Sequence, residues 1–397
     1  MKVTRREWLG ASITSLGTTL LSSGCAQRAP GPTVPSDPLA RFPGKMPMRV
    51  VNDRPPCLET PWRYFREDFT PNEAFYVRWH LQAIPTDIDL ASWRLRVGGA
   101  VDSPLELSMT DLRRLAEDEI VAVNQCSGNS RSLLAPRVAG AQWRNGAMGN
   151  ARWGGVSLAK VLRRAGVKAD AMQVTFDGLD EGPLSSVPDF QKAIDIDHAL
   201  QPEVTIAYEM NGESLPQLNG FPARLIVPGW YATYWVKMLH RITVLPKVYD
   251  GYWMAKAYKL PPTPNGNENP KDLAPYLVPI SKLNVRSFFT TPDNGADIPV
   301  GRPCPLDGIA FDDGSGISMV EVSSDDGATW TAAMLDADLG RFSFRRWRFV
   351  WTPQTRAPYG LRVRATSRDG QTQPEMVGWN RGGFMRNVVE ELSLRAV

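Results

Sequence analysis

The feature that most constrains the fold is a change of hydrophobic pattern near residue 280. Before it, short apolar runs at 173–176 and 223–227 are mixed with stretches at 109–115 and 158–165, in which apolar residues recur three or four positions apart. The short runs are typical of strands, and the longer spacing is typical of helices that pack one face against a core. The first part of the chain is therefore predicted to be a mixed α/β domain of the α+β class.

After residue 279 the pattern consists of short alternating runs separated by Asp, Gly and Pro. The predicted strands are 317–323, 330–335, 342–351 and 361–366. In the last of them apolar and charged residues alternate strictly, which predicts that one face packs inward and the arginines point to solvent. The turn at 324–327 can close a hairpin, because Gly327 readily takes a positive φ. This part is predicted to be a small immunoglobulin-like β-sandwich.

Length and composition agree with this division. A chain of 397 residues exceeds one typical core. Hydrophobic residues make up 43% and charged residues 22%, and the formal net charge is +3, so the composition is that of an ordinary globular protein and does not indicate nucleic-acid binding. The predicted segments are 1–40, 41–280 and 281–397.

The first 40 residues resemble an export leader followed by a tether. Arg5 and Arg6 precede an uncharged apolar stretch that ends at Leu21, a pattern similar to a twin-arginine export signal. The stretch is short for a membrane-spanning helix, so a removable leader and a periplasmic protein are expected. A frayed helix with two chance arginines is the simpler alternative. Cys25 could carry a lipid anchor, which stays open, and four prolines at 29–38 predict an extended tether.

Cysteine and histidine usage limits the metal chemistry of the chain. The four cysteines show no CxxC spacing, and the three histidines are scattered. Zinc ribbons, thioredoxin-like redox motifs and covalently attached haem are therefore excluded. Cys57 and Cys304 are predicted to be structural thiols.

Cys126 lies in a more informative setting. It follows an apolar run at 120–123 within the segment NQCSGNSR, which predicts a loop directly after a strand. A lone cysteine is most often a buried hydrophobic residue, and that interpretation stays open on spacing alone. A thiolate is also the soft ligand that suits molybdenum, and Arg131 supplies a fixed positive charge for an oxyanion near such a metal.

The neighbouring segments carry a resemblance to a known family. The segment CSGNSR at 126–131 resembles the molybdenum-binding segment of the sulfite oxidase family, whose animal members read CAGNRR, and FYVRWH at 75–80 is similar to the family's FFVRNH. Further similar segments, in the family's order, are 151–155, 176–180, 207–212, 219–224, 227–229, 236–237 and 252–259. Segments 320–330 and 378–380 are similar to the family's immunoglobulin-like dimerisation domain. The resemblance therefore runs from about residue 50 to the C terminus.

This resemblance implies a molybdopterin cofactor whose dithiolene sulfurs hold molybdenum together with Cys126. It implies four catalytic residues: Arg78 and Arg131 in the substrate pocket, His80 beside the pterin, and the active-site tyrosine Tyr258. The cofactor-binding residues that it implies are Tyr76, Val77, Arg78, Trp79, His80, Asp180, Asn219, Arg224, Trp235, Val236 and Lys237. No haem is expected in this chain.

The sequence departs from the animal pattern at specific positions. Ser130 stands in place of the first arginine of CAGNRR, and Asn219 stands in place of a histidine before the GFP triplet, so the pterin-phosphate contacts are expected to differ. The segment 230–235 lacks an arginine found in the animal and plant enzymes. The resemblance is therefore greatest to bacterial periplasmic sulfite dehydrogenases.

The function implied by the resemblance is the oxidation of sulfite to sulfate. Electrons are expected to pass to a c-type cytochrome, because the chain carries no fused redox-carrier motif. A homodimer through the C-terminal domain is also expected. Two alternatives stay open: a molybdopterin-dependent reductase of sulfoxide or nitrate-like substrates, and a non-catalytic exported binding protein. The joint presence of Arg78, Cys126, Arg131 and Tyr258 favours an enzyme.

Overall fold

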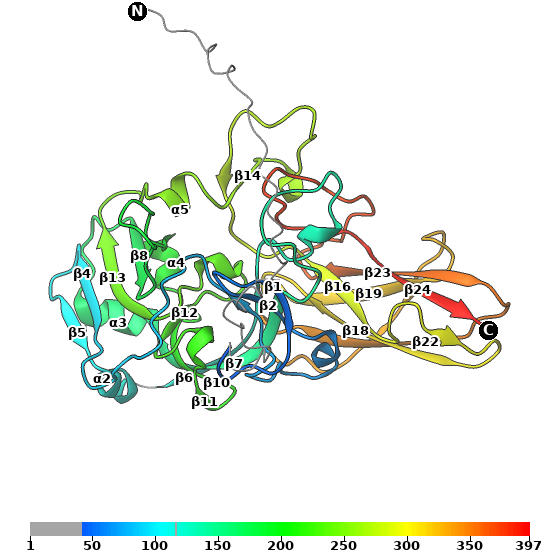
Figure 1. Ribbon diagram of the computed structural model, residues 1–397, viewed down its shortest axis with the longest axis horizontal. Helices are drawn as coiled ribbons and strands as arrows, with labels where there is room; N and C mark the ends of the chain where they lie inside the picture. Colours follow the sequence, from blue (N-terminus) through cyan, green and yellow to red (C-terminus); the bar gives the residue numbers. More distant parts are fainter. Residues whose placement is uncertain (1–41, 116) are drawn as a thin grey trace, which may run out of the picture.

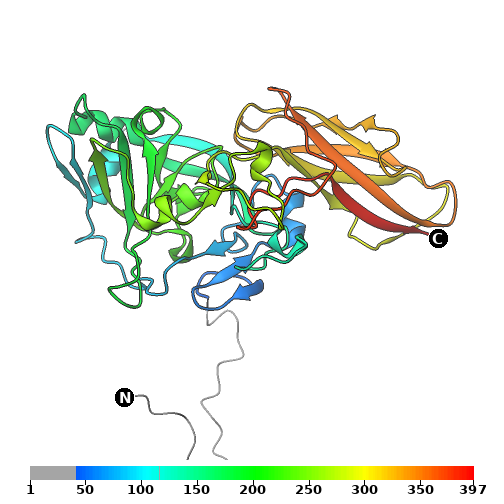
Figure 2. The ribbon, with the colours of Figure 1, turned by 90° about the horizontal axis from the view of Figure 1, so that it is seen from above.

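The computed structural model describes residues 42–115 and 117–397. The predicted leader, tether and lipid anchor lie outside the described residues. Figure 1 shows a larger part with sheets and short helices and a smaller part made of strands, and Figure 2 shows the same two parts next to one another from above. In the described ranges, no helix is both long enough and apolar enough to cross a membrane.

The larger part is built on two five-stranded sheets and one small sheet. The first sheet has the order β11-β10-β7-β6 with β12 beside β10, and its strands are β6 (Asp118–Gln125), β7 (Met148–Ser157), β10 (Thr205–Met210), β11 (Glu213–Ser214) and β12 (Arg224–Ile226). The second has the order β5-β4-β13-β8-β9, with β4 (Leu95–Gly99), β5 (Leu105–Leu107), β8 (Gln173–Gly178), β9 (Gln191–Asp195) and β13 (Leu239–Leu245). The small sheet joins β1 (Arg49–Asn52), β2 (Cys57–Glu59) and β3 (Val77–Arg78). Because β6 pairs with β7 along its whole length, the loop that follows β6 starts from a fixed point.

Short helices connect these sheets. The helix α3 (Leu158–Ala165) has the predicted bounds, and its apolar face, with Leu158, Val161 and Leu162, is fully buried. The helix α2 (Met109–Arg114) begins at Ser108, which forms a capping box with Asp111. The remaining helical segments are α4 (Ile196–Ala199), α5 (Tyr252–Ala255), η1 (Trp62–Arg66), η2 (Arg131–Leu133), η3 (Gln217–Asn219), η4 (Ala232–Tyr234) and η5 (Pro264–Gly266).

The smaller part consists of two stacked sheets, as the sequence predicts. One has the order β16-β18-β22-β21, with β16 (Arg286–Thr291), β18 (Cys304–Phe311), β21 (Met334–Leu335) and β22 (Arg345–Trp351). The other has the order β17-β24-β23-β19-β20, with β17 (Asp297–Ile298), β19 (Ile317–Ser323), β20 (Thr331–Ala332), β23 (Pro358–Ser367) and β24 (Glu390–Ala396). A ribbon of β14 (Lys259–Leu260) and β15 (Val278–Pro279) precedes them.

One strand prediction in the smaller part is wrong. The run 330–335 forms two short strands instead of one, because β20 pairs with β19 in one sheet and β21 pairs with β22 in the other. The chain therefore changes sheets at this point. The predicted hairpin turn is confirmed, and Gly327 has a φ of 89°.

The predicted alternation in β23 is also confirmed. Leu361, Val363 and Ala365 are fully buried, while the two arginines between them are partly exposed on the other face. These arginines are not simply solvated, because Arg364 Nε donates to Glu321 Oε2 at 2.8 Å.

The two parts share an apolar boundary. A second core lies inside the β-sandwich, around Trp347 and Leu361. The main core fills the larger part but also includes Phe288, Phe311 and Phe342 from the smaller one. The backbone N–H of Val123 on β6 donates to the carbonyl of Phe342 at 2.9 Å. The β-sandwich therefore packs directly against the strand that leads to Cys126.

Candidate active site

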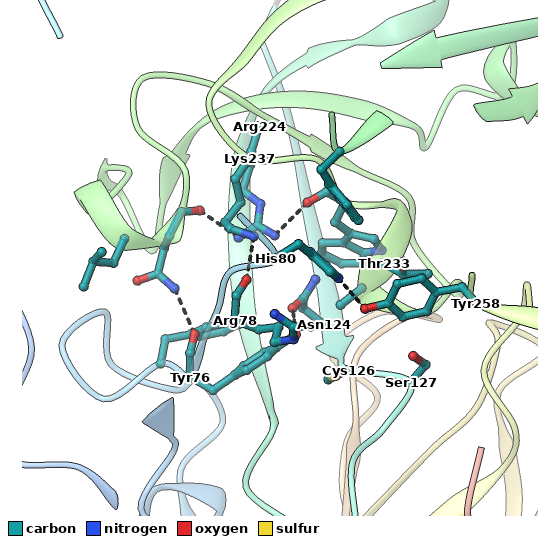
Figure 3. A pocket seen from close by; sticks show the side chains of 16 residues that line it. Tyr76, Arg78, His80, Asn124, Cys126, Ser127, Arg224, Thr233, Lys237 and Tyr258 are labelled. Atoms are coloured by element: carbon teal, nitrogen blue, oxygen red, sulfur yellow. Dashed lines mark hydrogen bonds between the residues drawn. The ribbon is translucent and has the colours of Figure 1, made fainter. Parts of the chain in front are cut away.

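A pocket in the larger part brings together most of the predicted site residues. Its lining residues are Phe75, Tyr76, Arg78, His80, Asn124, Cys126, Ser127, Phe190, Leu218, Asn219, Arg224, Ala232, Thr233, Trp235, Lys237 and Tyr258. Figure 3 shows that the labelled side chains come from three separate stretches of chain and from Tyr258, and that they converge on one space. Nine of the predicted site residues are in this wall: Tyr76, Arg78, His80, Cys126, Asn219, Arg224, Trp235, Lys237 and Tyr258.

Cys126 is positioned by the end of β6. Its backbone N–H donates to the carbonyl of Ala147 at 2.9 Å, and its carbonyl accepts from the N–H of Asn129 at 2.9 Å. The thiol is free, and the residue is 7% exposed at the pocket wall. Within the described residues, no group of three or more His, Cys, Asp or Glu side chains could hold a metal ion.

The pocket wall carries cations without carboxylate partners. Arg224 is 4% exposed and donates to the carbonyls of Asn219 at 2.8 Å and Trp235 at 3.3 Å. Lys237 Nζ donates to the carbonyl of Arg78 at 2.8 Å. Neither Arg224 nor Lys237 has a carboxylate within ion-pair distance among the described residues, although the charge of Asp180 lies near enough to act on the pKa of Lys237. Burial lowers the pKa of Arg224 to about 10, and burial together with the charge of Arg224 lowers the pKa of Lys237 to about 7.

Several polar atoms in the same wall also have no partner. They are Asn124 Nδ2, Ser127 Oγ, Arg224 Nε and Thr233 Oγ1, all buried and without a hydrogen bond among the described residues. Buried polar groups are nearly always paired in folded proteins. The wall is therefore suited to a polar, negatively charged ligand.

Tyr258 and His80 form a pair at one side of the pocket. His80 Nε2 and the Tyr258 hydroxyl are hydrogen-bonded, and the His80 ring stacks on Phe190 with centroids 3.8 Å apart. Burial and the neighbouring cations hold the pKa of His80 well below its ordinary value, so the ring is neutral. Burial raises the pKa of Tyr258, so the phenol keeps its proton.

The structure does not bring Arg131 to the pocket wall. Its Nε and Nη2 donate to the carbonyl of Gly382 at 3.3 and 3.0 Å, and its Nη1 donates to the carbonyl of Ala141 at 3.1 Å. The guanidinium also lies 5.2 Å from the ring centroid of Phe384. The hydrogen bonds of Arg131 are therefore to backbone carbonyls, and its charge acts on Cys126 and Tyr258 from outside the pocket wall. Its predicted role toward the substrate stays a prediction.

Four other predicted cofactor-binding residues lie behind the wall: Val77, Trp79, Asp180 and Val236. Trp79 Nε1 donates to the carbonyl of Leu218 at 3.0 Å. Burial raises the pKa of Asp180 to about 6. These side chains support the pocket residues beside them without lining the pocket.

Several lining residues were not predicted from the sequence. Asn124 and Ser127 flank Cys126, so their position beside the cysteine is a signal that could have identified them. Thr233 lies within the segment 230–235, so that segment could have identified it. Phe190 carries no such signal, because only the tertiary fold places it against His80. Asn219, at one of the departures from the animal pattern, accepts from Lys45 Nζ and donates to the carbonyl of Tyr76 at 3.1 Å.

Two family models match the chain. The oxidoreductase molybdopterin binding domain matches residues 80–253, and the Mo-co oxidoreductase dimerisation domain matches residues 278–395. Together with the pocket, these matches define the protein as a molybdopterin-type oxidoreductase.

Comparison with known proteins identifies the family more narrowly. The mitochondrial sulfite oxidase of Macaca fascicularis is 35% identical over 376 residues, which cover 90% of this chain and 67% of that protein. The sulfite oxidase of Gallus gallus is 35% identical over 375 residues, with coverage of 90% and 80%. An NADH nitrate reductase of Arabidopsis thaliana is 29% identical over 369 residues but is covered only to 40%. The chain belongs to the sulfite oxidase family.

A solved structure has the same fold. The sulfane dehydrogenase SoxCD of Paracoccus pantotrophus superposes with a TM-score of 0.72 over 85% of this chain and 84% of that chain, at 23% sequence identity. The pocket residues fit the cofactor of this family: Cys126 offers one thiolate, and the unpaired cations and polar atoms suit a phosphate-bearing pterin.

Proposed function

We propose that this protein oxidises sulfite to sulfate at a molybdenum centre held by Cys126, and that a c-type cytochrome accepts the electrons. The observation that carries the proposal is the placement of Cys126, Arg78 and Tyr258 in the wall of one pocket lined with unpaired cations. The net reaction converts sulfite and water to sulfate, two electrons and two protons.

The cofactor and the protein have separate tasks. When bound, molybdopterin supplies the two-electron oxygen-transfer chemistry. The thiolate of Cys126 would be the protein ligand of the metal, and Arg224 and Lys237 would bind the anionic part of the pterin. The orphan Nδ2 of Asn124 and the hydroxyl of Thr233 would complete its polar contacts.

Arg78 and Tyr258 would bind the substrate. A guanidinium presents paired N–H donors that match two oxygens of an oxyanion, and such charge-assisted hydrogen bonds contribute about 1.5–3 kcal/mol. The protonated hydroxyl of Tyr258 can donate to a third oxygen without repelling the anion. Because His80 is neutral, its Nε2–H can donate to the Tyr258 hydroxyl oxygen, which holds the phenol in place and leaves the hydroxyl proton free for the substrate.

The partners and the compartment are part of the same proposal. The four cysteines are not arranged to hold an iron–sulfur cluster or covalent haem, so we assign the electrons to a separate one-electron carrier. The leader with Arg5 and Arg6 supports export to the periplasm, where c-type cytochromes are found. Cys25 is a candidate lipid anchor. The match to a dimerisation domain over residues 278–395 supports a homodimer.

The test is sulfite-dependent reduction of cytochrome c by purified, molybdenum-loaded protein. We expect activity in the wild type and in Cys304→Ser, whose thiol lies in the β-sandwich, and loss of activity in Cys126→Ser. A wild-type protein that binds molybdenum and ignores sulfite, yet reduces a sulfoxide or nitrate with reduced viologen, would contradict the proposal. Molybdenum-free protein from an export-competent, molybdenum-replete host would favour a binding protein.

A further inference from the structure

We propose that residues 380–385, which we name the clamp loop, form a positioning element for Tyr258 and for the loop that carries Cys126. The clamp loop belongs to the C-terminal segment that follows the strand β23 of the smaller part. Its principal contact is Phe384, so Phe384 is a positioning residue. The inference rests on the proposed function and adds to it a positioning role for the clamp loop.

The ring of Tyr258 is held from two sides. Phe384 stacks on it with centroids 5.4 Å apart and planes inclined by 18°. His80 lies against it with centroids 5.4 Å apart and planes inclined by 74°, and is bonded to its hydroxyl. Stacking of this kind fixes the plane of a ring, and the hydrogen bond fixes its rotation within that plane. Loss of Phe384 would therefore leave the hydroxyl bonded but the ring free to tilt.

The clamp loop also binds the segment that carries Cys126. The backbone N–H of Met385 donates to the carbonyl of Ser127 at 2.9 Å. The carbonyl of Gly382 accepts two hydrogen bonds from Arg131. Gly383 has a φ of 60°, and a Cβ there would lie 2.8 Å from Arg131 Nε, so the close approach requires glycine. Arg131 therefore joins the Cys126 segment to the clamp loop.

The clamp loop is itself rigidly held. The side chain of Asn380, 2% exposed, accepts from the N–H of Phe384 at 3.0 Å and donates to its carbonyl at 2.9 Å. Arg381 forms a bidentate ion pair with Glu268, and hydrogen bonds from Arg381 lower the pKa of that carboxyl to about 2. Figure 1 shows this red segment next to the loop that follows β14.

These contacts connect the β-sandwich to the reacting centre. Tyr258 and the Cys126 segment come from different parts of the larger domain, and both contact the same short loop of the smaller one. A displacement of Phe384 should therefore misplace the Tyr258 hydroxyl while Arg78 still binds the oxyanion, so kcat should fall more than KM rises. This difference distinguishes a positioning role from a general loss of stability.

The experiment compares three variants of the molybdenum-loaded enzyme. Phe384→Leu removes the ring, and Phe384→Tyr keeps it. Phe289→Leu is the matched control, because Phe289 is 6% exposed in the core of the β-sandwich, where it contacts Trp347 at a centroid distance of 5.4 Å. For each we measure kcat and KM for sulfite per bound molybdenum, the thermal unfolding temperature, and the electron paramagnetic resonance spectrum of Mo(V) prepared with dithionite.

We expect Phe384→Leu to lower kcat about tenfold, with KM within about twofold of the wild type and a changed Mo(V) spectrum. Phe384→Tyr should have the kcat and the Mo(V) spectrum of the wild type. Phe289→Leu should unfold at a lower temperature and keep the wild-type kcat and spectrum. A wild-type kcat and spectrum in Phe384→Leu, or the same losses in Phe289→Leu, would overturn the proposal. If the wild-type enzyme does not oxidise sulfite, the proposed function is wrong. The Mo(V) spectra are prepared with dithionite and need no sulfite, so they still show whether Phe384 affects the molybdenum site.

Discussion

Two buried arginine sites in this molecule differ in their counter-charge. Arg286, on β16 behind the Cys126 segment, is 1% exposed and pairs with Glu390 at 2.7 Å. Arg224, in the pocket wall, is 4% exposed and donates only to two backbone carbonyls among the described residues. Buried charges are normally paired. A carboxylate therefore supplies counter-charge at the junction between the two parts. The pocket wall has no such carboxylate on Arg224 among the described residues, so it is suited to negative charge that a ligand brings.

Breaking the buried ion pair at the junction should have the largest effect on stability. Glu390 accepts hydrogen bonds from both Arg286 and Arg386, so Glu390→Gln leaves two guanidinium groups without a carboxylate. Removing one partner of a buried ion pair typically costs about 3–5 kcal/mol, and we expect the free energy of unfolding in urea to fall by that amount.

The control for this variant is Asp297→Asn, which breaks an exposed pair with Arg395. It should lower the free energy of unfolding far less, because water screens an exposed ion pair. If Glu390→Gln costs no more than Asp297→Asn, the junction does not depend on its buried pair and the contrast with the pocket is lost.

Removing a pocket cation should act on the reaction. Arg78→Met deletes the proposed oxyanion donor, and we expect kcat/KM for sulfite per bound molybdenum to fall about 100-fold, since two charge-assisted hydrogen bonds are lost. Arg78→Lys keeps the charge without the paired donors, so an intermediate loss is expected. Steady-state kinetics that show a wild-type kcat/KM in Arg78→Met would remove Arg78 from substrate binding.

The sequence could predict the elements of this fold better than their contacts. The bounds of α3 and β19 follow from local periodicity, because one buried face is enough to specify a helix or a strand. The prediction of one strand at 330–335 is wrong because local periodicity does not show which sheet a residue joins. The packing of two sheets divides this run into β20 and β21.

The candidate site shows the same limit. Cys126, Arg78 and Tyr258 could be predicted because each lies in a segment that resembles the family, and the structure places all three in one wall. A motif does not state where a long side chain points, and Arg131 turns to the carbonyl of Gly382, more than 200 positions later in the chain. The contact of Phe384 with Tyr258 depends on tertiary structure in the same way.

Lys237 offers a weaker test of the unpaired site. Lys237→Met removes one pocket cation, so we expect the affinity for the anionic cofactor to fall about tenfold, close to the lower limit for a hydrogen bond to a charged group. Molybdenum retained per protein after gel filtration measures this loss. Lys282→Met, at a side chain that is 67% exposed, should retain molybdenum like the wild type. Equal retention in both variants would contradict a cofactor-binding role for Lys237.

The smallest effect is a difference between two slopes of stability against pH, and it tests the contrast between the two sites without a substitution. Burial lowers the pKa of Lys237 and of Lys192 from 10.5 to about 7. Above pH 7 the unfolded chain therefore binds more protons at these lysines than the native state, so the stability of cofactor-free protein should rise with pH up to about 10. Each lysine contributes at most about 1.4 kcal/mol per pH unit.

The bound cofactor should reduce this dependence on pH. An anionic cofactor beside Lys237 raises the pKa of the lysine, so the stability of the loaded protein should rise less steeply with pH. Unfolding temperatures between about pH 7.5 and 9.5 measure both slopes, and equal slopes would mean that the ligand does not neutralise the pocket.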